Sequence, residues 1–290
     1  MKKASVVLIC LIITGPLSII GAATVEPART NSDQVFVNGA VYTMNQDMPW
    51  AEAVAITDGV VVAVGANSVI SEYIGYMTRV NDLKGRMLMP AFHDAHAHPI
   101  WSGIDQLKCP VFGMPSIEAI QNEVARCLNS TTTQSTGWVV GAGYNLGLFP
   151  AGNANKSLLD AVSSEIPIYL DGEDGHSGWA NSKALELAGI TADTPNPELG
   201  IIEKDPVSGE PTGTLREPAA ISLIKQIIPG DDLELFDDGL LFAQNLAHSF
   251  GITSIIAASV GEHHLAAYKR LADKGGLNLR MITSIEYGNT

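Results

Sequence analysis

The alternation of strand-like and helix-like segments beyond residue 100 restricts the fold of this chain more than any other feature. Strand patterns occupy 137–144, 166–171, 252–257 and 279–285, and helical patterns occupy 117–128, 181–188, 217–228, 233–250 and 263–274. Strands that are separated by helices favour a parallel sheet with helical crossovers. The sequence therefore predicts an α/β fold for this part of the chain.

The stretch before residue 87 has a different pattern. Short β-like runs lie at 34–37, 40–43, 53–56 and 60–64. Asn38-Gly39 and Asp58-Gly59 separate these runs, and both dipeptides are typical of type I′ hairpins. We expect a small antiparallel sheet module over 34–86, followed by a second domain over 87–290. Within that domain, the stretch 191–213 is rich in Pro, Gly and acidic residues and predicts a loop or a small insertion.

The N-terminus has the pattern of a targeting segment. Lys2 and Lys3 precede an apolar run over 4–20, and small residues follow at 21–23. This order predicts a cleavable signal peptide over 1–23 and a periplasmic or secreted protein. An uncleaved membrane anchor is the alternative, although the apolar run is short for a membrane span. Residues 24–33 are polar, contain Pro and predict a flexible leader.

Net charge and cysteine content limit the partners and the compartment. The formal net charge of −14 argues against a nucleic-acid surface, because phosphate binding needs clustered Lys and Arg. Beyond the signal peptide we expect no membrane partner. Cys109 and Cys127 lie after the signal peptide, and they either pair in an oxidising compartment or remain two buried thiols.

The strongest chemical signal is His96-Ala97-His98, which follows the hydrophobic strand entry at Met87–Pro90. Residues i and i+2 of a strand point to the same face, so both imidazoles can bind one divalent ion, usually zinc. The alternative is a pair of ordinary surface or core histidines. Asp94 lies two residues before the pair on the same face, where it either orients an imidazole or caps the strand.

Several segments resemble one enzyme family. The stretches 51–65 and 83–99 resemble the signature of the amidohydrolase superfamily. The stretches 174–185 and 209–219 are similar to amidohydrolase family 3, a branch that includes N-substituted formamide deformylases. The resemblance covers about residues 34–290.

The resemblance implies a fold and a chemistry. It implies a partial TIM (β/α)8 barrel of the metal-dependent hydrolase type beside a small N-terminal β-sandwich module. It also implies that His96 and His98 are the first ligands of zinc or another divalent metal ion. The bound ion would activate a water molecule that attacks a non-peptide C–N bond, such as an amide or formamide, of a small-molecule substrate.

Two further residues fall within the matched segments. Glu217 is either a carboxylate ligand of the metal or a helix N-terminal carboxylate stabilised by the helix dipole. His176 is either a catalytic residue that orients substrate or polarises its carbonyl, or a loop histidine with local hydrogen bonds. Trp179 and Asn181 either shape the same pocket or pack in the core, and we favour packing.

The number of predicted barrel strands raises a second interpretation. Five strands are expected, near 88–96, 138–143, 167–171, 252–257 and 279–285, whereas a complete barrel needs eight. An open five-stranded barrel leaves unpaired strand edges, which would promote a homo-oligomer. We therefore expect a truncated chain or a fragment, and the alternative to an enzyme is a non-catalytic binding or vestigial protein.

Overall fold

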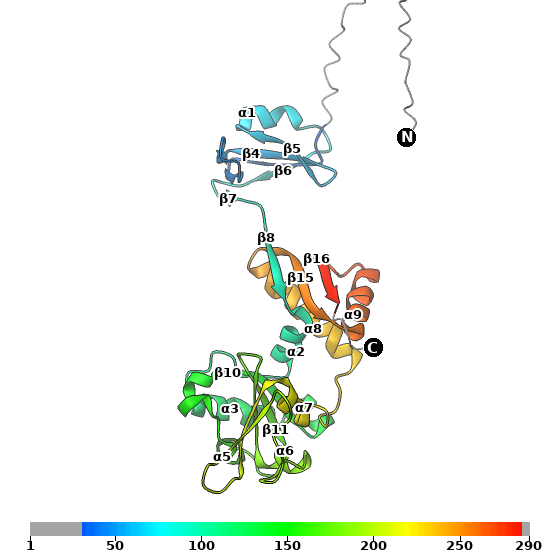
Figure 1. The fold of residues 1–290 in the computed structure, drawn as a ribbon. Coiled ribbons are helices and arrows are strands. Elements are labelled where there is room, and N and C mark those ends of the chain that lie inside the picture. The colour runs from blue at the N-terminus through cyan, green and yellow to red at the C-terminus, as the bar shows by residue number, and fades with distance from the viewer. Residues whose placement is uncertain (1–30, 286–290) are drawn as a thin grey trace, which may run out of the picture. The chain divides into compact units, whose positions relative to one another are not determined.

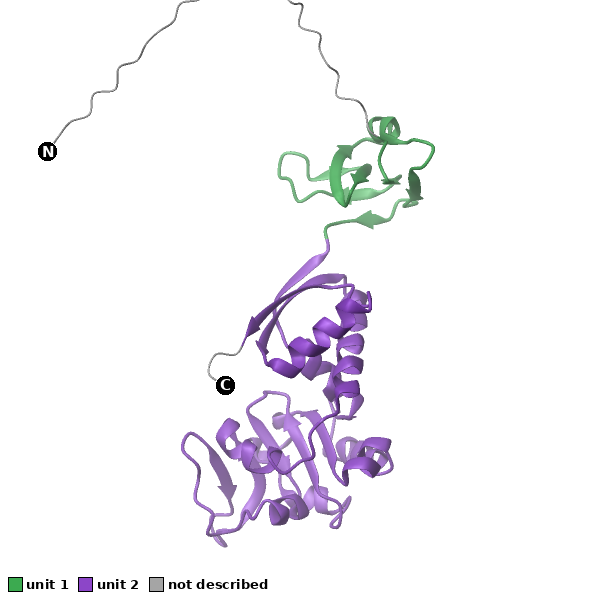
Figure 2. Ribbon diagram, turned by 90° about the vertical axis from the view of Figure 1, so that its right-hand side faces the viewer, with its two compact units in different colours: residues 1–90 green, residues 91–290 purple. Residues whose placement is uncertain are grey.

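The computed structural model describes residues 31–285 (Figure 1). The chain forms two compact units, which divide between Pro90 and Ala91 (Figure 2). The predicted signal peptide, and all of the predicted leader except residues 31–33, lie outside the described residues. From 31 to 285, no helix has both the length and the apolar character that a membrane crossing requires.

The first unit contains two small sheets. The four-stranded sheet has the order β5-β4-β1-β6, and the three-stranded sheet has the order β3-β2-β7. Their strands are β1 (Gln34–Val37), β2 (Ala40–Tyr42), β3 (Trp50–Ala51), β4 (Ala53–Thr57), β5 (Val60–Gly65), β6 (Arg79–Asp82) and β7 (Met87–Leu88). Helix α1 (Asn67–Ile70) and the 3-10 turn η1 (Ser71–Tyr73) follow β5. Val35, Ala53, Ala55 and Ile70 form the buried core.

One of the two predicted hairpins is confirmed. Asp58 and Gly59 both have positive φ, at 51° and 74°, and they join the antiparallel strands β4 and β5. The Asn38-Gly39 hairpin is wrong, because β1 and β2 belong to different sheets. At Gly39, a Cβ would lie 2.2 Å from Leu83 Cδ1, so this glycine permits close packing where the chain passes between the sheets.

The sequence predicted purely antiparallel pairing in the first unit, and the structure shows parallel pairs as well. Strand β1 pairs in parallel with β6, and β2 pairs in parallel with β7. These pairings join strands that are distant in the sequence, whereas turn dipeptides report only on strands that are adjacent in it.

The second unit contains a three-stranded parallel sheet with the order β16-β15-β8. Its strands are β8 (Phe92–Ala97), β15 (Ile252–Val260) and β16 (Arg280–Ile285). Helices α2 (Pro99–Leu107), α8 (Leu233–Ser249) and α9 (Glu262–Asp273) contribute to one apolar cluster with β15. Ile104, Leu240, Ala257 and Leu271 are buried members of this cluster, one from each of these elements.

A six-stranded sheet is formed by the chain between α2 and α8. Its order is β13-β14-β12-β11-β10-β9, with parallel pairing from β9 to β11 and antiparallel pairing from β11 to β13. The strands are β9 (Cys109–Pro110), β10 (Val139–Tyr144), β11 (Ile168–Gly172), β12 (Ser177–Ala180), β13 (Ile201–Lys204) and β14 (Pro211–Arg216). Its helical segments are α3 (Ile117–Cys127), α4 (Thr131–Thr136), η2 (Leu146–Leu148), η3 (Pro150–Gly152), α5 (Lys156–Asp160), α6 (Ser182–Leu187) and α7 (Glu217–Lys225).

The five strands predicted for one barrel therefore lie in two sheets. Strands β8, β15 and β16 share the three-stranded sheet, whereas β10 and β11 belong to the six-stranded one. The expectation of a single sheet is wrong because strand–helix alternation predicts parallel pairing but does not say which strands pair. The stretch 191–213, predicted as a loop or small insertion, contains β13 and the beginning of β14.

Helices α2 and α8 are in close contact at two buried glycines. A Cβ built on Gly103 would lie 1.9 Å from the carbonyl oxygen of Gly239. Beyond this contact, Lys108 follows α2 and Asp231 precedes α8, and their side chains form a 2.6 Å ion pair. The chain thus leaves α2 and returns to α8 at neighbouring points.

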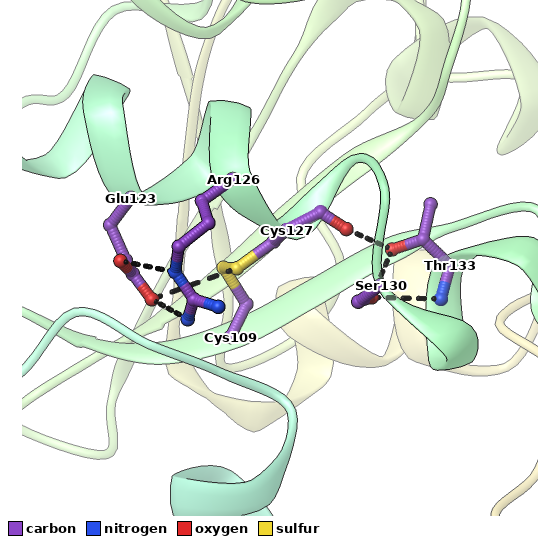
Figure 3. Close-up of a disulfide and its surroundings, with 6 residues drawn as sticks. All are labelled: Cys109, Glu123, Arg126, Cys127, Ser130 and Thr133. Carbon is purple, nitrogen blue, oxygen red and sulfur yellow. Dashed lines mark hydrogen bonds and ion pairs between the residues drawn. A yellow bond between two sulfur atoms is a disulfide. The ribbon is translucent and has the colours of Figure 1, made fainter.

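A disulfide joins Cys109 of β9 to Cys127 at the end of α3 (Figure 3). The sequence left open whether these cysteines pair or remain two buried thiols, and the structure shows that they pair. Both cysteines are buried. Nearby, the Thr133 hydroxyl donates a hydrogen bond to the Cys127 carbonyl oxygen at 2.8 Å. The exposed Arg126 forms an ion pair with Glu123 of the same helix, whose side chain is mostly buried.

Candidate active site

His96 and His98 lie at the carboxyl end of β8. Their ring centroids are 5.3 Å apart and the ring planes are perpendicular. His96 is within the strand and exposed, whereas His98 is half-buried at the junction between β8 and α2. The structure therefore brings the two predicted ligands together at the end of a parallel strand.

A hydrogen bond determines the tautomer of the neutral His98 ring. Its Nδ1 lies 3.1 Å from the carbonyl oxygen of Ala258 in β15. A carbonyl oxygen can only accept, so Nδ1 carries the proton and the neutral ring has its lone pair on Nε2. Metal-binding histidines commonly use this arrangement, in which the second ring nitrogen donates to a backbone carbonyl.

The backbone beside Ala258 has an unusual conformation. Ser259 has φ of +50°, and the pairing of β15 with β16 shifts register between Ala257 and Val260. Positive φ is uncommon for residues other than glycine, so the position is held by its surroundings. The Trp101 ring stacks on the His98 ring, with the two centroids 5.1 Å apart.

Asp94 contacts the backbone of this site. Its Oδ1 accepts a hydrogen bond from the backbone N–H of His96 at 3.0 Å. The carboxylate thereby holds the strand backbone at His96, the residue that carries the first imidazole. The expectation that Asp94 orients an imidazole ring stays a prediction.

The donor set of the pair fits a zinc ion in chemistry but not in number. Two imidazoles are typical zinc ligands, and a complete site needs at least one more protein ligand. In residues 31–285, Cys109, Glu123 and Cys127 form the one group of three potential ligands whose donor atoms lie within 4.8 Å of one another. Disulfide-bonded sulfurs are not thiolates, so this group is not a metal site.

His176 and Glu217 form a second polar pair. His176 Nδ1 lies 2.9 Å from Glu217 Oε2, and the Glu217 backbone N–H donates to the His176 carbonyl oxygen at 2.8 Å. Both side chains are exposed. The hydrogen bond to Glu217 and its negative charge raise the pKa of His176 above its usual 6.5. Glu217 is also the first residue of α7, which matches the alternative of a helix N-terminal carboxylate.

A cleft of about 810 Å³ adjoins these residues within the second unit. Of the residues predicted for the site, His98 and His176 line it. The Trp101 ring and the Asp105 carboxyl extend from α2 along its wall, and Asp171 lies at the carboxyl end of β11. The volume is in the range that small-molecule sites have.

The cleft contains charged residues that were not predicted from the sequence. Lys225 Nζ pairs with Asp171 Oδ2 at 2.9 Å, and the Tyr169 hydroxyl donates to Asp171 Oδ1 at 2.7 Å. Burial, together with the nearby charge of Asp171, raises the pKa of Asp105 to about 6. Asp171 ends a predicted strand, which is a recognisable position for a ligand-binding residue. Asp105 had no such signal, because helix α2 was not predicted.

Trp179 and Asn181 pack in the interior, as favoured from the sequence. Trp179 is fully buried, and its Nε1 donates to the Asn155 carbonyl oxygen at 3.1 Å. Asn181 is also fully buried, and its Oδ1 accepts hydrogen bonds from the backbone N–H groups of Ile168 and Ala184. It thereby caps helix α6 and joins it to β11.

Comparison with known proteins gives both sequence and structural relatives. Protein LONG AFTER FAR-RED 3 of Arabidopsis thaliana is 29% identical over 230 residues, a match that covers 79% of this chain and 39% of that protein. The N-substituted formamide deformylase of Arthrobacter pascens is 32% identical over 192 residues, covering 65% of this chain and 35% of that enzyme. The crystal structure of an uncharacterized metal-dependent hydrolase from Pyrococcus furiosus aligns with a TM-score of 0.59 at 24% identity.

That structural alignment covers 87% of this chain and 50% of the other. Because the sequence identity is low, the alignment shows that the two chains share a fold and nothing more. This chain thus spans half or less of the length of these three relatives. Residues 79–289, which include β8 and both histidines, match the Amidohydrolase family. The chain therefore belongs to the amidohydrolase family.

Proposed function

We propose that this chain contributes the first metal ligands of a hydrolase that cleaves non-peptide C–N bonds, such as those of amides and formamides. The observation that carries the proposal is the His98 ring, whose Nδ1 donates to Ala258 and whose Nε2 keeps its lone pair. The similarity to an N-substituted formamide deformylase supports this class of substrate.

Each residue of the site has a defined part in this proposal. His96 and His98 would hold zinc or another divalent ion, which supplies Lewis acidity and lowers the pKa of a water molecule. Glu217 favours the protonated form of His176, so this ring can donate a hydrogen bond to a substrate carbonyl or a proton to a leaving amine. Asp94 fixes the backbone of His96. Glu217 thus supports His176 here, and its role as a metal ligand is the alternative.

The proposed fold extends the observed sheets. We infer that β8, β15 and β16, with their helical crossovers, form the first strands of a (β/α)8 barrel. We also infer that the two sheets of the first unit are the layers of a small β-sandwich. We propose the activity for a protein that has the complete barrel, and a truncated, non-catalytic binding or vestigial protein is the alternative.

Zinc binding tests the site directly. We would titrate the purified chain with zinc in a calorimeter, because a site with two protein ligands binds more weakly than a complete one and can lose its ion on dialysis. The His96→Ala/His98→Ala double variant should lose the ion. His248→Ala is the matched control, since His248 is an exposed histidine of α8 outside the site. Near-stoichiometric zinc in the wild type and the control, with loss in the double variant, supports the proposal, and a wild type without zinc overturns it.

A second variant tests the observation behind the proposal. Ser259→Val places a β-branched residue at positive φ, which it adopts poorly, whereas Ser259→Gly is compatible with that backbone. We expect Ser259→Val to weaken zinc binding by about 10- to 100-fold, as loss of a supporting hydrogen bond does. Nitrogen NMR of the His98 ring should report the lost tautomer preference. Equal zinc affinity in both variants would remove the role of the Ala258 carbonyl.

We also propose that the protein is exported. The basic and apolar start of the sequence supports this, and so does the disulfide, because disulfides persist in oxidising compartments. Mass spectrometry of the protein from the periplasm or the medium should find an N-terminus near residue 24. Recovery of the uncleaved chain in the cytoplasm alone would contradict export.

A further inference from the structure

The cleft of the second unit has an excess of negative charge and two exposed aromatic rings. We propose that it binds an organic cation, and that the substrate of the hydrolase carries a positively charged group beside the bond that is cleaved. The part concerning the substrate rests on the proposed function, whereas the cation site stands on the cleft itself.

The charges that line the cleft do not balance. Five carboxylates face two lysine ammonium groups in its lining, and the positive form of His176, which also lines the cleft, pairs with Glu217 outside the lining. Each lysine has a carboxylate of its own, since Lys108 pairs with Asp231 at 2.6 Å and Lys225 pairs with Asp171 at 2.9 Å. Asp105, Glu173 and Asp174 are the three carboxylates that remain. An uncharged or anionic ligand would leave this excess uncompensated.

Asp174 and Asp105 differ in how they are held. Asp174 Oδ1 accepts hydrogen bonds from the backbone N–H groups of His176 and Ser177, and its Oδ2 accepts one from the Ser177 hydroxyl. Asp105 is half-buried on α2 and makes neither a hydrogen bond nor an ion pair within residues 31–285. A buried carboxylate is costly unless it is paired, so a cation at this position gains more than one at the surface.

The apolar part of the cleft fits the rest of such a ligand. Trp101 and Phe112 both line it and are each 43% exposed, although large aromatic side chains are usually well covered. Trp101 lies one turn before Asp105 on α2, so its ring and the carboxylate are on the same helix face. Aromatic faces attract cations through their quadrupole, and this adds to the attraction of the carboxylate.

The location connects the cation site to the proposed chemistry. His98 stacks on Trp101, and both His98 and His176 line the same cleft. A ligand whose charge lies at Asp105 thus extends along the Trp101 ring towards His98. A substrate with a cationic group near its amide or formamide bond would be oriented by this arrangement.

Three related probes test the cation site. We would measure binding of benzylammonium, benzyl alcohol and benzoate to the full chain at low salt and about pH 8, where Asp105 is ionised. A chelator keeps the protein free of metal, so the result does not depend on zinc. Because the probes share one ring and differ in charge, we expect benzylammonium to bind about tenfold tighter than benzyl alcohol and benzoate to bind weakest.

Two variants locate the effect. Asp105→Asn preserves the shape of the side chain and should weaken benzylammonium binding about tenfold without changing benzyl alcohol binding. Asp238→Asn removes the same charge from an exposed position of α8 outside the cleft lining, and it should change neither. Equal affinities of the three probes for the wild type would overturn the proposal, as would equal effects of the two variants.

The zinc measurement separates this inference from the proposed function. Probe discrimination that fails in a chain that binds zinc through His96 and His98 overturns the cation site alone. Probe discrimination in a chain that binds no zinc supports the cation site and overturns the metal site.

Discussion

The close contact between α2 and α8 lets us predict how the Gly103→Ala substitution changes the stability of the second unit. A Cβ at this position would lie 1.9 Å from the Gly239 oxygen, 2.5 Å from its carbonyl carbon and 2.8 Å from its Cα. Real Cβ contacts almost never fall below 3.0 Å, so Gly103→Ala requires the helices to separate locally by 3.0 − 1.9 = 1.1 Å. The obstacle is backbone, which cannot rotate away as a flexible side chain can.

Two opposing effects determine the change in the free energy of unfolding. Alanine is a better helix former than glycine by about 1 kcal/mol, which would stabilise α2. Overpacking a well-packed interior costs about 1–3 kcal/mol, and contact with backbone favours the upper end. The net expectation is a loss of about 2 kcal/mol, which lowers the melting temperature of a unit of this size by about 4–8 °C.

Thermal unfolding followed by circular dichroism checks this expectation. Gly230→Ala is the matched control, because a Cβ at Gly230 has nothing within 4 Å, and its melting temperature should remain close to that of the wild type. If Gly103→Ala melts at or above the wild-type temperature, helix propensity dominates and the close approach of α2 and α8 is refuted.

Three further predictions concern the disulfide and two titrating groups. Cys109→Ser/Cys127→Ser opens a link between residues 18 apart, which should cost about 3 kcal/mol and lower the melting temperature by about 6–12 °C, and the reduced wild type should behave alike. The pKa of His176, followed by NMR, should lie above 6.5 and fall towards it in Glu217→Gln; the stability from this pair is complete below 6.5 and is lost as pH rises through the raised pKa. The pKa of the Asp105 carboxyl is raised from 3.8 to about 6, so the wild type loses stability as pH rises between these values. Asp105→Asn should be more stable than the wild type by at most about 3 kcal/mol at about pH 8, and the two proteins should be equally stable at about pH 4. A difference in the free energy of unfolding that stays constant across this range would contradict the burial of the charge.

Local features of this fold were predictable from the sequence. A helix was expected over 117–128, and the Ser116 side chain accepts a hydrogen bond from the Ala119 N–H at the start of α3. The strands at β10, β11, β15 and β16 were located to within a few residues. Periodicity and capping residues determine such elements through neighbours along the chain, so a single sequence contains the necessary signal.

The assignment of strands to sheets was not predictable in the same way. The pairing of β8 with β15 joins residues about 160 positions apart, and the residue pattern of neither strand indicates which other strand it pairs with. For the same reason, the sequence suggested His98 but not Ala258, whose carbonyl defines the state of the imidazole ring. Asp105 was missed because its environment comes from Asp171 and Lys225, which other elements contribute.

The ion pair between Lys108 and Asp231 has a consequence for how this molecule can change over evolutionary time. The ion pair joins the first and last residues of the segment that forms the six-stranded sheet, so this segment begins and ends at neighbouring points. Segments with adjacent ends can be inserted, exchanged or shortened with little effect on the scaffold that carries them. Strand β8 and the two histidines at its carboxyl end belong to that scaffold, whereas much of the cleft wall belongs to the exchangeable segment. Ligand preference can therefore diversify by replacement of one contiguous module while the histidine pair is inherited unchanged.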